Sequence, residues 1–112
     1  MIRFYILDEQ GEPIELDQSD PRRYRFWEEL DRRRVGYDLV GDVVVSTVFF
    51  TLQGRPVLWE TLVQGGRLDG QIARYTSRAD AIEGHERTLA QVWRVEQIRV
   101  VDGGGENSGN PR

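Results

Sequence analysis

The sequence predicts a single α+β domain in which an antiparallel sheet of about four to five strands packs with two amphipathic helices. A run of β-branched and aromatic residues, a turn signal and a second such run predict a long central hairpin over residues 43–64. Apolar residues at helical spacing predict helices over about 21–34 and 78–93. The length of 112 residues fits one domain over 1–101, followed by a disordered, glycine-rich tail over 102–112.

Composition excludes several functional classes. All 15 basic residues are arginines, and the net charge of −4 argues against bulk nucleic-acid binding as the role of this chain. Cysteine is absent, which excludes disulfides, thiolate nucleophiles and zinc–thiolate sites. No stretch has the length and hydropathy of a signal peptide or a membrane span, so we expect a cytoplasmic protein with no membrane partner.

The N-terminal third begins with a strand and continues into a helix. Residues 1–7 are β-prone and stop at a turn-rich stretch over 8–13. Asp20 can accept hydrogen bonds from free backbone amides, and Pro21 suits the first position of a helix. The helix behind them has apolar residues at a spacing of three, namely Tyr24, Trp27 and Leu30.

The central hairpin has a turn signal at residues 53–56. If Gln53 and Pro56 flank that turn, one face pairs Phe50 with Trp59, Val48 with Thr61 and Ser46 with Val63. The other face then pairs Phe49 with Glu60 and Thr47 with Leu62. Both faces are largely apolar, so we expect one to pack on the helices and the other to meet a partner or a second copy.

A third strand and the second helix complete the domain. A loop over 65–70 with three glycines should lead into a strand over 71–75. Residues 77–80 have the form of a capping box, and the helix behind it places five residues on one face: Ile82, His85, Leu89, Val92 and Trp93. Residues 95–101 fit either a last strand or an extension of this helix.

Several sequence blocks resemble a group of small uncharacterised proteins encoded by tailed bacteriophages and prophages. The blocks are GDVVVSTVFF over 41–50, VLWETLV over 57–63 followed by two glycines, RYT over 74–76, and AIEGH over 81–85. The resemblance implies a phage setting and no known chemistry. The chain departs from the group by a shorter turn between the paired strands and by Gln64, where an aromatic residue often lies.

Two side chains are candidates for acid–base chemistry. His85 is the only histidine and lies in the apolar stripe of its helix, where a structural histidine bonded to a carboxylate or backbone group is the favoured interpretation. Glu60 lies in a strand, and its pairing with Arg74 on the neighbouring strand is favoured over catalysis. Ser46 and Thr47 lack the nucleophile-elbow motif of serine hydrolases. Neither a metal site nor a cofactor is predicted.

Candidate binding residues are aromatic and arginine side chains. They are Phe49, Phe50 and Trp59 of the hairpin, Arg67 of the glycine loop, Arg74 and Tyr75 of the third strand, and Arg22 and Arg25 of the first helix. The glycine loop could cradle a phosphate through its amides, although a plain hairpin loop is the favoured interpretation. The arginines of the first helix alternate with aromatic residues, but neighbouring carboxylates favour a salt-bridged helix surface.

The leading hypothesis is a non-enzymatic phage accessory protein that binds a host protein or complex, for example as an inhibitor or sequestering protein of host defence. As alternatives to a host protein, the chain could bind a nucleotide, or it could form a homodimer through the hairpin face. Two other classes stay open: a small enzyme acting on a nucleotide or phosphate-containing substrate through His85 and Glu60, and a virion or assembly component. The sequence names no target and no activity.

Overall fold

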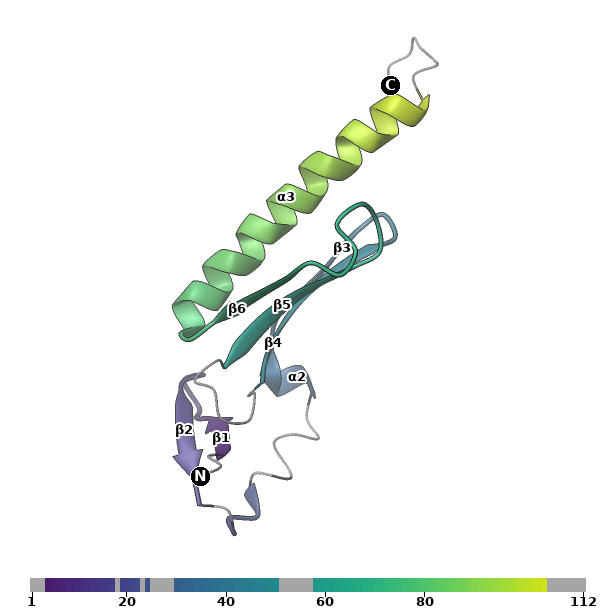
Figure 1. Ribbon diagram of the computed structural model, residues 1–112. Helices are drawn as coiled ribbons and strands as arrows, with labels where there is room; N and C mark the ends of the chain where they lie inside the picture. The colour runs from purple at the N-terminus through teal and green to yellow at the C-terminus, as the bar shows by residue number, and fades with distance from the viewer. Residues whose placement is uncertain (1–3, 18, 23, 25–29, 51–57, 105–112) are drawn as a thin grey trace.

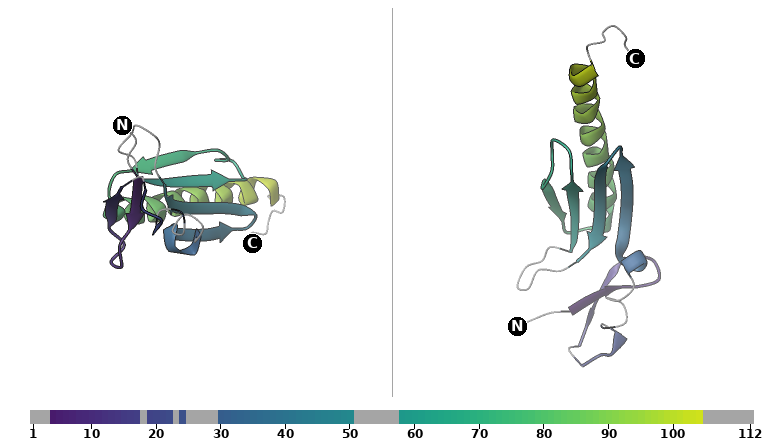
Figure 2. Two further views of the ribbon diagram at one scale, coloured as in Figure 1. Left: turned by 90° about the horizontal axis from the view of Figure 1, so that it is seen from below. Right: turned by 90° about the vertical axis from the view of Figure 1, so that its right-hand side faces the viewer.

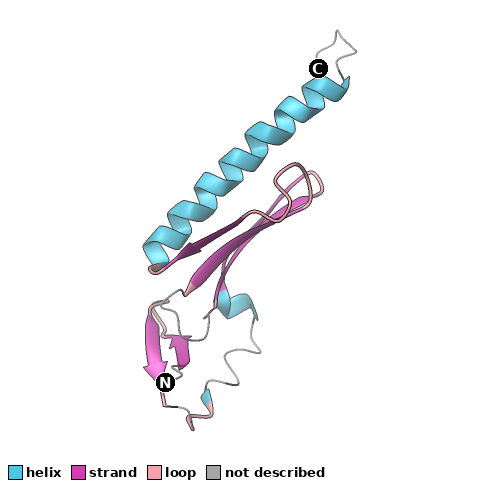
Figure 3. Ribbon diagram, viewed as in Figure 1, coloured by secondary structure: helices cyan, strands magenta, loops and turns pink. Residues whose placement is uncertain are grey.

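The computed structural model describes residues 4–17, 19–22, 24, 30–50 and 58–104, and it has an α+β architecture with antiparallel sheets. Its elements appear in Figures 1 and 3. In chain order they are β1 (Phe4–Leu7), β2 (Pro13–Leu16), α2 (Leu30–Arg33), β3 (Arg34–Val40), β4 (Val43–Phe49), β5 (Trp59–Gln64), β6 (Ile72–Tyr75) and α3 (Arg78–Gly104).

The strands form a two-stranded sheet of β1 and β2 and a four-stranded sheet in the order β3-β4-β5-β6. Helix α3 lies along one face of the larger sheet, and its C-terminal turns project beyond the strands (Figure 1). In the right-hand view of Figure 2, α3 lies behind the sheet and no described element lies in front of it. The larger sheet therefore has one covered face and one open face.

The small sheet is a hairpin that the sequence analysis only half predicted. The expected strand ends at Leu7, but the expected loop over 8–13 gives way to a second strand, β2, at Pro13. Asp8 closes the turn because its carboxylate accepts hydrogen bonds from the amides of Gln10 and Glu12, both at 2.9 Å. The alternation of apolar and polar residues covers too few positions in so short a strand to be recognised from sequence.

A tight turn separates β3 from β4. The sequence analysis began the central hairpin at residue 43, whereas a further strand, β3, precedes it and pairs Val40 with Val43 across a two-residue loop. Gly41 has a φ of 60°, a left-handed conformation that glycine adopts without a steric penalty. A glycine followed by an aspartate is thus the signal that makes two strands from one apolar run.

The predicted register of the β4–β5 hairpin is wrong by one residue. Phe49 pairs with Trp59, Thr47 with Thr61 and Val45 with Val63. A shift of one residue exchanges the two faces of a strand. The observed register gathers the large apolar side chains of both strands on the face that α3 covers, and hydrophobic burial favours that arrangement.

The helices also differ from the expectation. The predicted helix over 21–34 stops earlier, because Arg34 already belongs to β3, and its middle lies outside the described residues. The second helix begins at Arg78 as predicted, with the Asp80 amide donating to Ser77 Oγ at 3.1 Å. It continues past 93 to Gly104, so residues 95–101 extend the helix and the expected tail begins later. The remainder of that tail lies outside the described residues.

Two apolar clusters lie under α3. One joins the small hairpin to the sheet and the start of α3 and contains Ile6, Leu7, Leu16, Phe49, Trp59, Tyr75 and Ala81. The other lies further along α3 and contains Val43, Val45, Val63 and Val92. Between them the same face carries buried polar side chains, among them Thr47, Thr61 and His85. A polar layer therefore divides an otherwise apolar interior.

Candidate functional site

A chain of hydrogen bonds crosses the interior between the two apolar clusters. Tyr75 Oη donates to Thr61 Oγ1 at 3.0 Å, and Thr61 Oγ1 lies 2.5 Å from Thr47 Oγ1. Thr47 Oγ1 lies 2.7 Å from Nδ1 of His85, whose Nε2 lies 2.7 Å from Oδ2 of Asp38. The chain links β6, β5, β4, α3 and β3 in that order, and we call it the polar chain.

The bonding partners assign a direction to the polar chain. An ionised carboxylate only accepts, so Nε2 of His85 carries the proton that it donates to Asp38. In the neutral imidazole Nδ1 accepts from Thr47, which in turn accepts from Thr61, and Tyr75 donates at the far end. Each hydroxyl donates once and accepts at most once, so every side chain of the polar chain has a partner.

Two glycines make room for the rings of the polar chain. A Cβ on Gly36 of β3 would lie 2.6 Å from Nε2 of His85. A Cβ on Gly84 of α3 would overlap the ring and hydroxyl of Tyr75. Close packing of the two rings against these backbones therefore requires glycine at both positions.

The order carboxylate, imidazole, hydroxyl is also that of a nucleophilic triad. However, Thr47 has an exposed fraction of 0%, Thr61 of 1% and His85 of 3%. A nucleophile must reach its substrate, and the Thr47 hydroxyl lies beneath α3 instead. The favoured interpretation of His85 from the sequence, a structural histidine bonded to a carboxylate, agrees with this geometry, and Asp38 is that carboxylate.

The two acid–base candidates lie apart. Glu60 pairs with Val48, so its side chain points to the open face, opposite Thr61 and the polar chain. There it forms the expected ion pair, with Arg74 Nε 3.1 Å from Glu60 Oε2. The sheet itself separates Glu60 from His85, so the pair does not form an acid–base site.

Three predicted binding residues belong to the core. Phe49 and Trp59 are fully buried and pack edge to face with ring centroids 5.3 Å apart, and Tyr75 is 8% exposed. The corrected register places these rings under α3, where they are inaccessible to a partner. Phe50 is half-buried at the end of the hairpin strand, where its amide donates to the Leu58 carbonyl.

The predicted arginines have separate environments. Arg22 is exposed and bonds Asp20, and that bond is the main cause that lowers the pKa of Asp20 and raises the pKa of Arg22. The Arg22 amide also donates to Asp20, as the predicted capping role requires. Arg74 is held by Glu60, and Arg25 lies outside the described residues.

Two amides of the glycine loop over 65–70 donate to carboxylates, one within the loop and one on α3. The Gly65 amide donates to Asp69 Oδ1 at 2.6 Å, and the Arg67 amide donates to Glu96 Oε2 at 3.0 Å. These are the amides that a phosphate cradle would offer, and the two carboxylates would repel an anion. The geometry thus agrees with the favoured interpretation, a hairpin loop.

The open face of the larger sheet is the first accessible surface of note. Alternation along the strands gives its apolar members as Tyr37, Leu39, Val44, Val48, Leu62 and Ile72, which we call the open face. Tyr37 and Ile72 are each 48% exposed and Leu39 is 62% exposed. The charged features among them are the ion pair of Glu60 with Arg74 and the guanidinium of Arg34, which lies 4.5 Å from the centre of the Tyr37 ring. These exposed side chains lie on the two edge strands, with the half-buried Val44, Val48 and Leu62 between them, and such an apolar sheet face indicates a contact surface.

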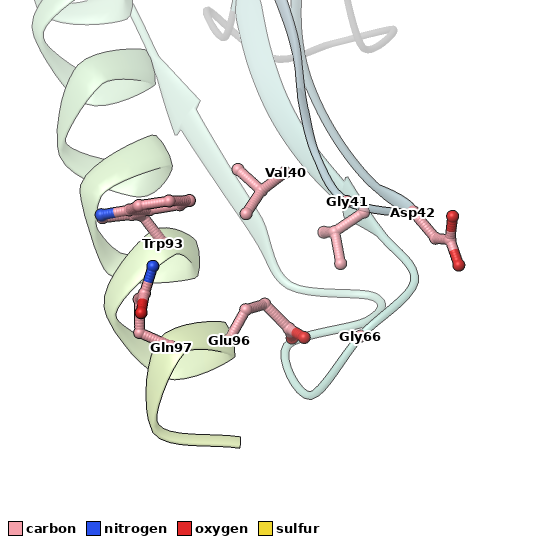
Figure 4. A pocket seen from close by; sticks show the side chains of 8 residues that line it. Val40, Gly41, Asp42, Gly66, Trp93, Glu96 and Gln97 are labelled. Carbon is pink, nitrogen blue, oxygen red and sulfur yellow. The ribbon is translucent and has the colours of Figure 1, made fainter. Parts of the chain in front are cut away.

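A groove between α3 and the β3–β4 hairpin is the second accessible surface. It consists of pockets of about 530 and 380 Å³ that share Trp93 and Val40. Trp93 is 56% exposed, and Figure 4 shows its indole between the backbone of α3 and Val40. The sequence analysis placed Trp93 in the apolar stripe of the helix, whereas it lies at the side of α3 next to Val40 and stays accessible there.

Two further searches of the described residues gave negative results. No three histidine, aspartate or glutamate side chains gather there as a metal-binding cluster. No helix in the described part is long and apolar enough to cross a membrane.

Comparisons with known proteins give no family for this chain. No protein-family model matches it, and no match was found among the curated proteins or the solved structures.

Proposed function

We propose that this chain is a binding module that recognises a partner protein through the open face of its larger sheet. The observation that carries the proposal is the contrast between the two faces. The imidazole of His85 is sealed beneath α3, whereas apolar side chains on the other face are accessible. Covering such an apolar sheet face with another protein is favourable, because it removes apolar surface from water.

The sequence blocks that resemble phage proteins support a more specific form of the proposal. In that form the chain is a phage accessory protein that binds a component of host defence. Two blocks, over 41–50 and 57–63, contribute strands β4 and β5 at the centre of the open face. On this face Glu60 and Arg74 neutralise each other and the Arg34 guanidinium lies over the Tyr37 ring, so shape and apolar contact would carry most of the recognition.

The proposal is tested by changing one side chain on each face of the molecule. Ile72→Glu places a charge on the open face, and Ile82→Glu places the same charge on the surface of α3 at a similar exposure, 42% against 48%. The wild-type protein and both variants are used to capture partners from a bacterial lysate. We expect a stoichiometric partner with the wild type and with Ile82→Glu, and none with Ile72→Glu. Retention of that partner by Ile72→Glu would contradict the use of this face.

A second measurement separates a partner protein from a second copy. Sedimentation equilibrium of the purified wild-type chain should give the mass of a monomer. A dimer that Ile72→Glu dissociates and Ile82→Glu does not would assign the open face to self-association and overturn the proposal of a foreign partner.

A further inference from the structure

The smaller pocket of the groove combines a flat aromatic wall with carboxylates. Its volume is about 380 Å³, and its described lining residues are Asp38, Leu39 and Val40 of β3 with Glu86, Leu89, Ala90 and Trp93 of α3. Both ionisable side chains in this lining are acidic. A cation would find charge complementarity here, and an anion would be repelled.

Asp38 is held in the pocket by the polar chain. Its Oδ2 accepts from His85, and its side chain is still 47% exposed. A carboxylate anchored by a buried histidine keeps its orientation while its outer lone pairs stay accessible. Glu86 is exposed and has no hydrogen bond or ion pair to the described residues. The pocket thus offers one oriented and one mobile carboxylate.

Trp93 favours arginine among cationic groups. Indole is the best partner of a cation above an aromatic ring, and a planar guanidinium also stacks on it. With 56% of its surface exposed, the Trp93 side chain has an accessible area onto which such a group could stack. Guanidinium further matches the fork of a carboxylate, which a compact ammonium does not.

Strand β3 favours a peptide over a small molecule. It lies at the edge of the larger sheet, so one row of its backbone amides and carbonyls has no strand partner among the described residues. Such an edge accepts an extended peptide as an added strand. We propose that the groove binds an arginine-bearing extended peptide, with the guanidinium between Trp93 and the carboxylates of Asp38 and Glu86.

This site lies between α3 and β3, shares only Leu39 with the open face, and does not depend on the function proposed for that face. The second pocket continues the groove past Trp93. In Figure 4 Glu96 points toward the turn at Gly66, while Asp42 points away from α3 at the rim. A peptide longer than the arginine contact can therefore extend in this direction.

The test uses the full chain and a blocked pentapeptide of sequence valine, threonine, arginine, threonine, valine. Titration is followed by ¹⁵N NMR, in which we expect the Trp93 indole N–H and the amides over 38–40 to shift. Replacing the arginine by citrulline, which keeps the shape and removes the charge, should weaken binding at least fivefold. Shifts confined to other residues, or none, would overturn the proposal.

Matched variants locate the contact. Trp93→Ala and Glu86→Gln should each weaken binding at least threefold, because each removes a direct partner of the guanidinium. Glu83→Gln removes an exposed carboxylate of α3 that does not line the pocket and should change affinity less than twofold. Equal affinity of all variants would contradict the assignment. Equal affinity of N-acetylarginine amide and the pentapeptide would overturn the role of the β3 edge.

Discussion

At the scale of single residues, the main feature is a polar chain in an apolar interior. Thr47, Thr61 and His85 are each at most 3% exposed, and Tyr75 closes the chain at one end. A buried hydroxyl or imidazole is tolerated because it is bonded, and breaking one bond leaves its neighbours unpaired. The chain therefore acts as a unit that fixes the position of α3 over the sheet.

Replacing Thr47 by valine keeps the shape and removes the hydroxyl. Since both His85 and Thr61 lose a partner, we expect the free energy of unfolding to fall by about 1–3 kcal/mol. Urea denaturation followed by circular dichroism measures this loss. Thr76→Val, an identical change at an exposed position, should alter stability by less than about 0.5 kcal/mol. An equal effect of the two substitutions would count against the chain as a structural unit.

Asp20 provides a prediction about pH. Its bond with Arg22 lowers its pKa below the usual 3.8, so the ionised form is favoured in the folded protein. The contribution of this bond is present above the usual pKa and is lost as pH falls through the lowered value. A ¹³C NMR titration of the Asp20 carboxyl should therefore have a midpoint below 3.8, and Arg22→Gln should raise it. No change in Arg22→Gln would refute the assignment of the cause.

At the scale of elements, tertiary packing outweighs local helix propensity in α3. Gly84 lies inside the helix, where alanine is ordinarily better by about 1 kcal/mol. The helix keeps glycine because the ring of Tyr75 from β6 lies against this backbone position. The close approach of helix and sheet also brings His85 within reach of Asp38 and Thr47.

Gly84→Ala should consequently destabilise the protein by about 1–3 kcal/mol, as overpacked cores do. Thermal unfolding of the variant measures the loss. Glu83→Ala, the neighbouring exposed position, serves as the control and should have little effect. The double variant Gly84→Ala, Tyr75→Ala should lose less stability than the sum of the losses in the two single variants. Strict additivity would show that the clash lies elsewhere.

At the scale of the whole molecule, the small hairpin and the larger sheet share one core. Ile6, Leu7 and Leu16 pack in the same cluster as Trp59 and the start of α3. The buried rings of this cluster lie at the junction of the two sheets, which explains why they cannot also serve a partner. The accessible functional surfaces are left on the open face and in the groove.

A shared core predicts cooperative unfolding. Leu7→Ala should lower the free energy of unfolding by about 2–5 kcal/mol. The loss of stability should extend to β4, β5 and α3 as well as to the hairpin. Hydrogen exchange, measured segment by segment, distinguishes this from a local loss. Leu39→Ala on the open face, 62% exposed, should leave exchange unchanged. Faster exchange confined to residues 4–16 would mean that the hairpin is an independent unit.

Local chemistry in the sequence was sufficient for several features. The capping residues at Ser77 and Asp80 determined where α3 begins, and the alternation of apolar residues determined the strands at the centre of the sheet. The ion pair of Glu60 with Arg74 followed from the neighbouring strands alone. These features depend on residues a few positions apart or on one strand pairing, so composition and spacing contain the information.

Only the tertiary structure decided the register, the partners of His85 and the groove. Asp38 and His85 are 47 positions apart, and Thr47 and His85 are 38 positions apart, so no local pattern joins them. The register depends on whether the loop between β4 and β5 has an odd or even number of residues, and burial of Phe49 with Trp59 on one face settles that choice. The sequence by itself determined the central strands and the start of α3, but not β2 or the length of α3. Packing determined which side chains meet, because burial free energy belongs to the assembled layers.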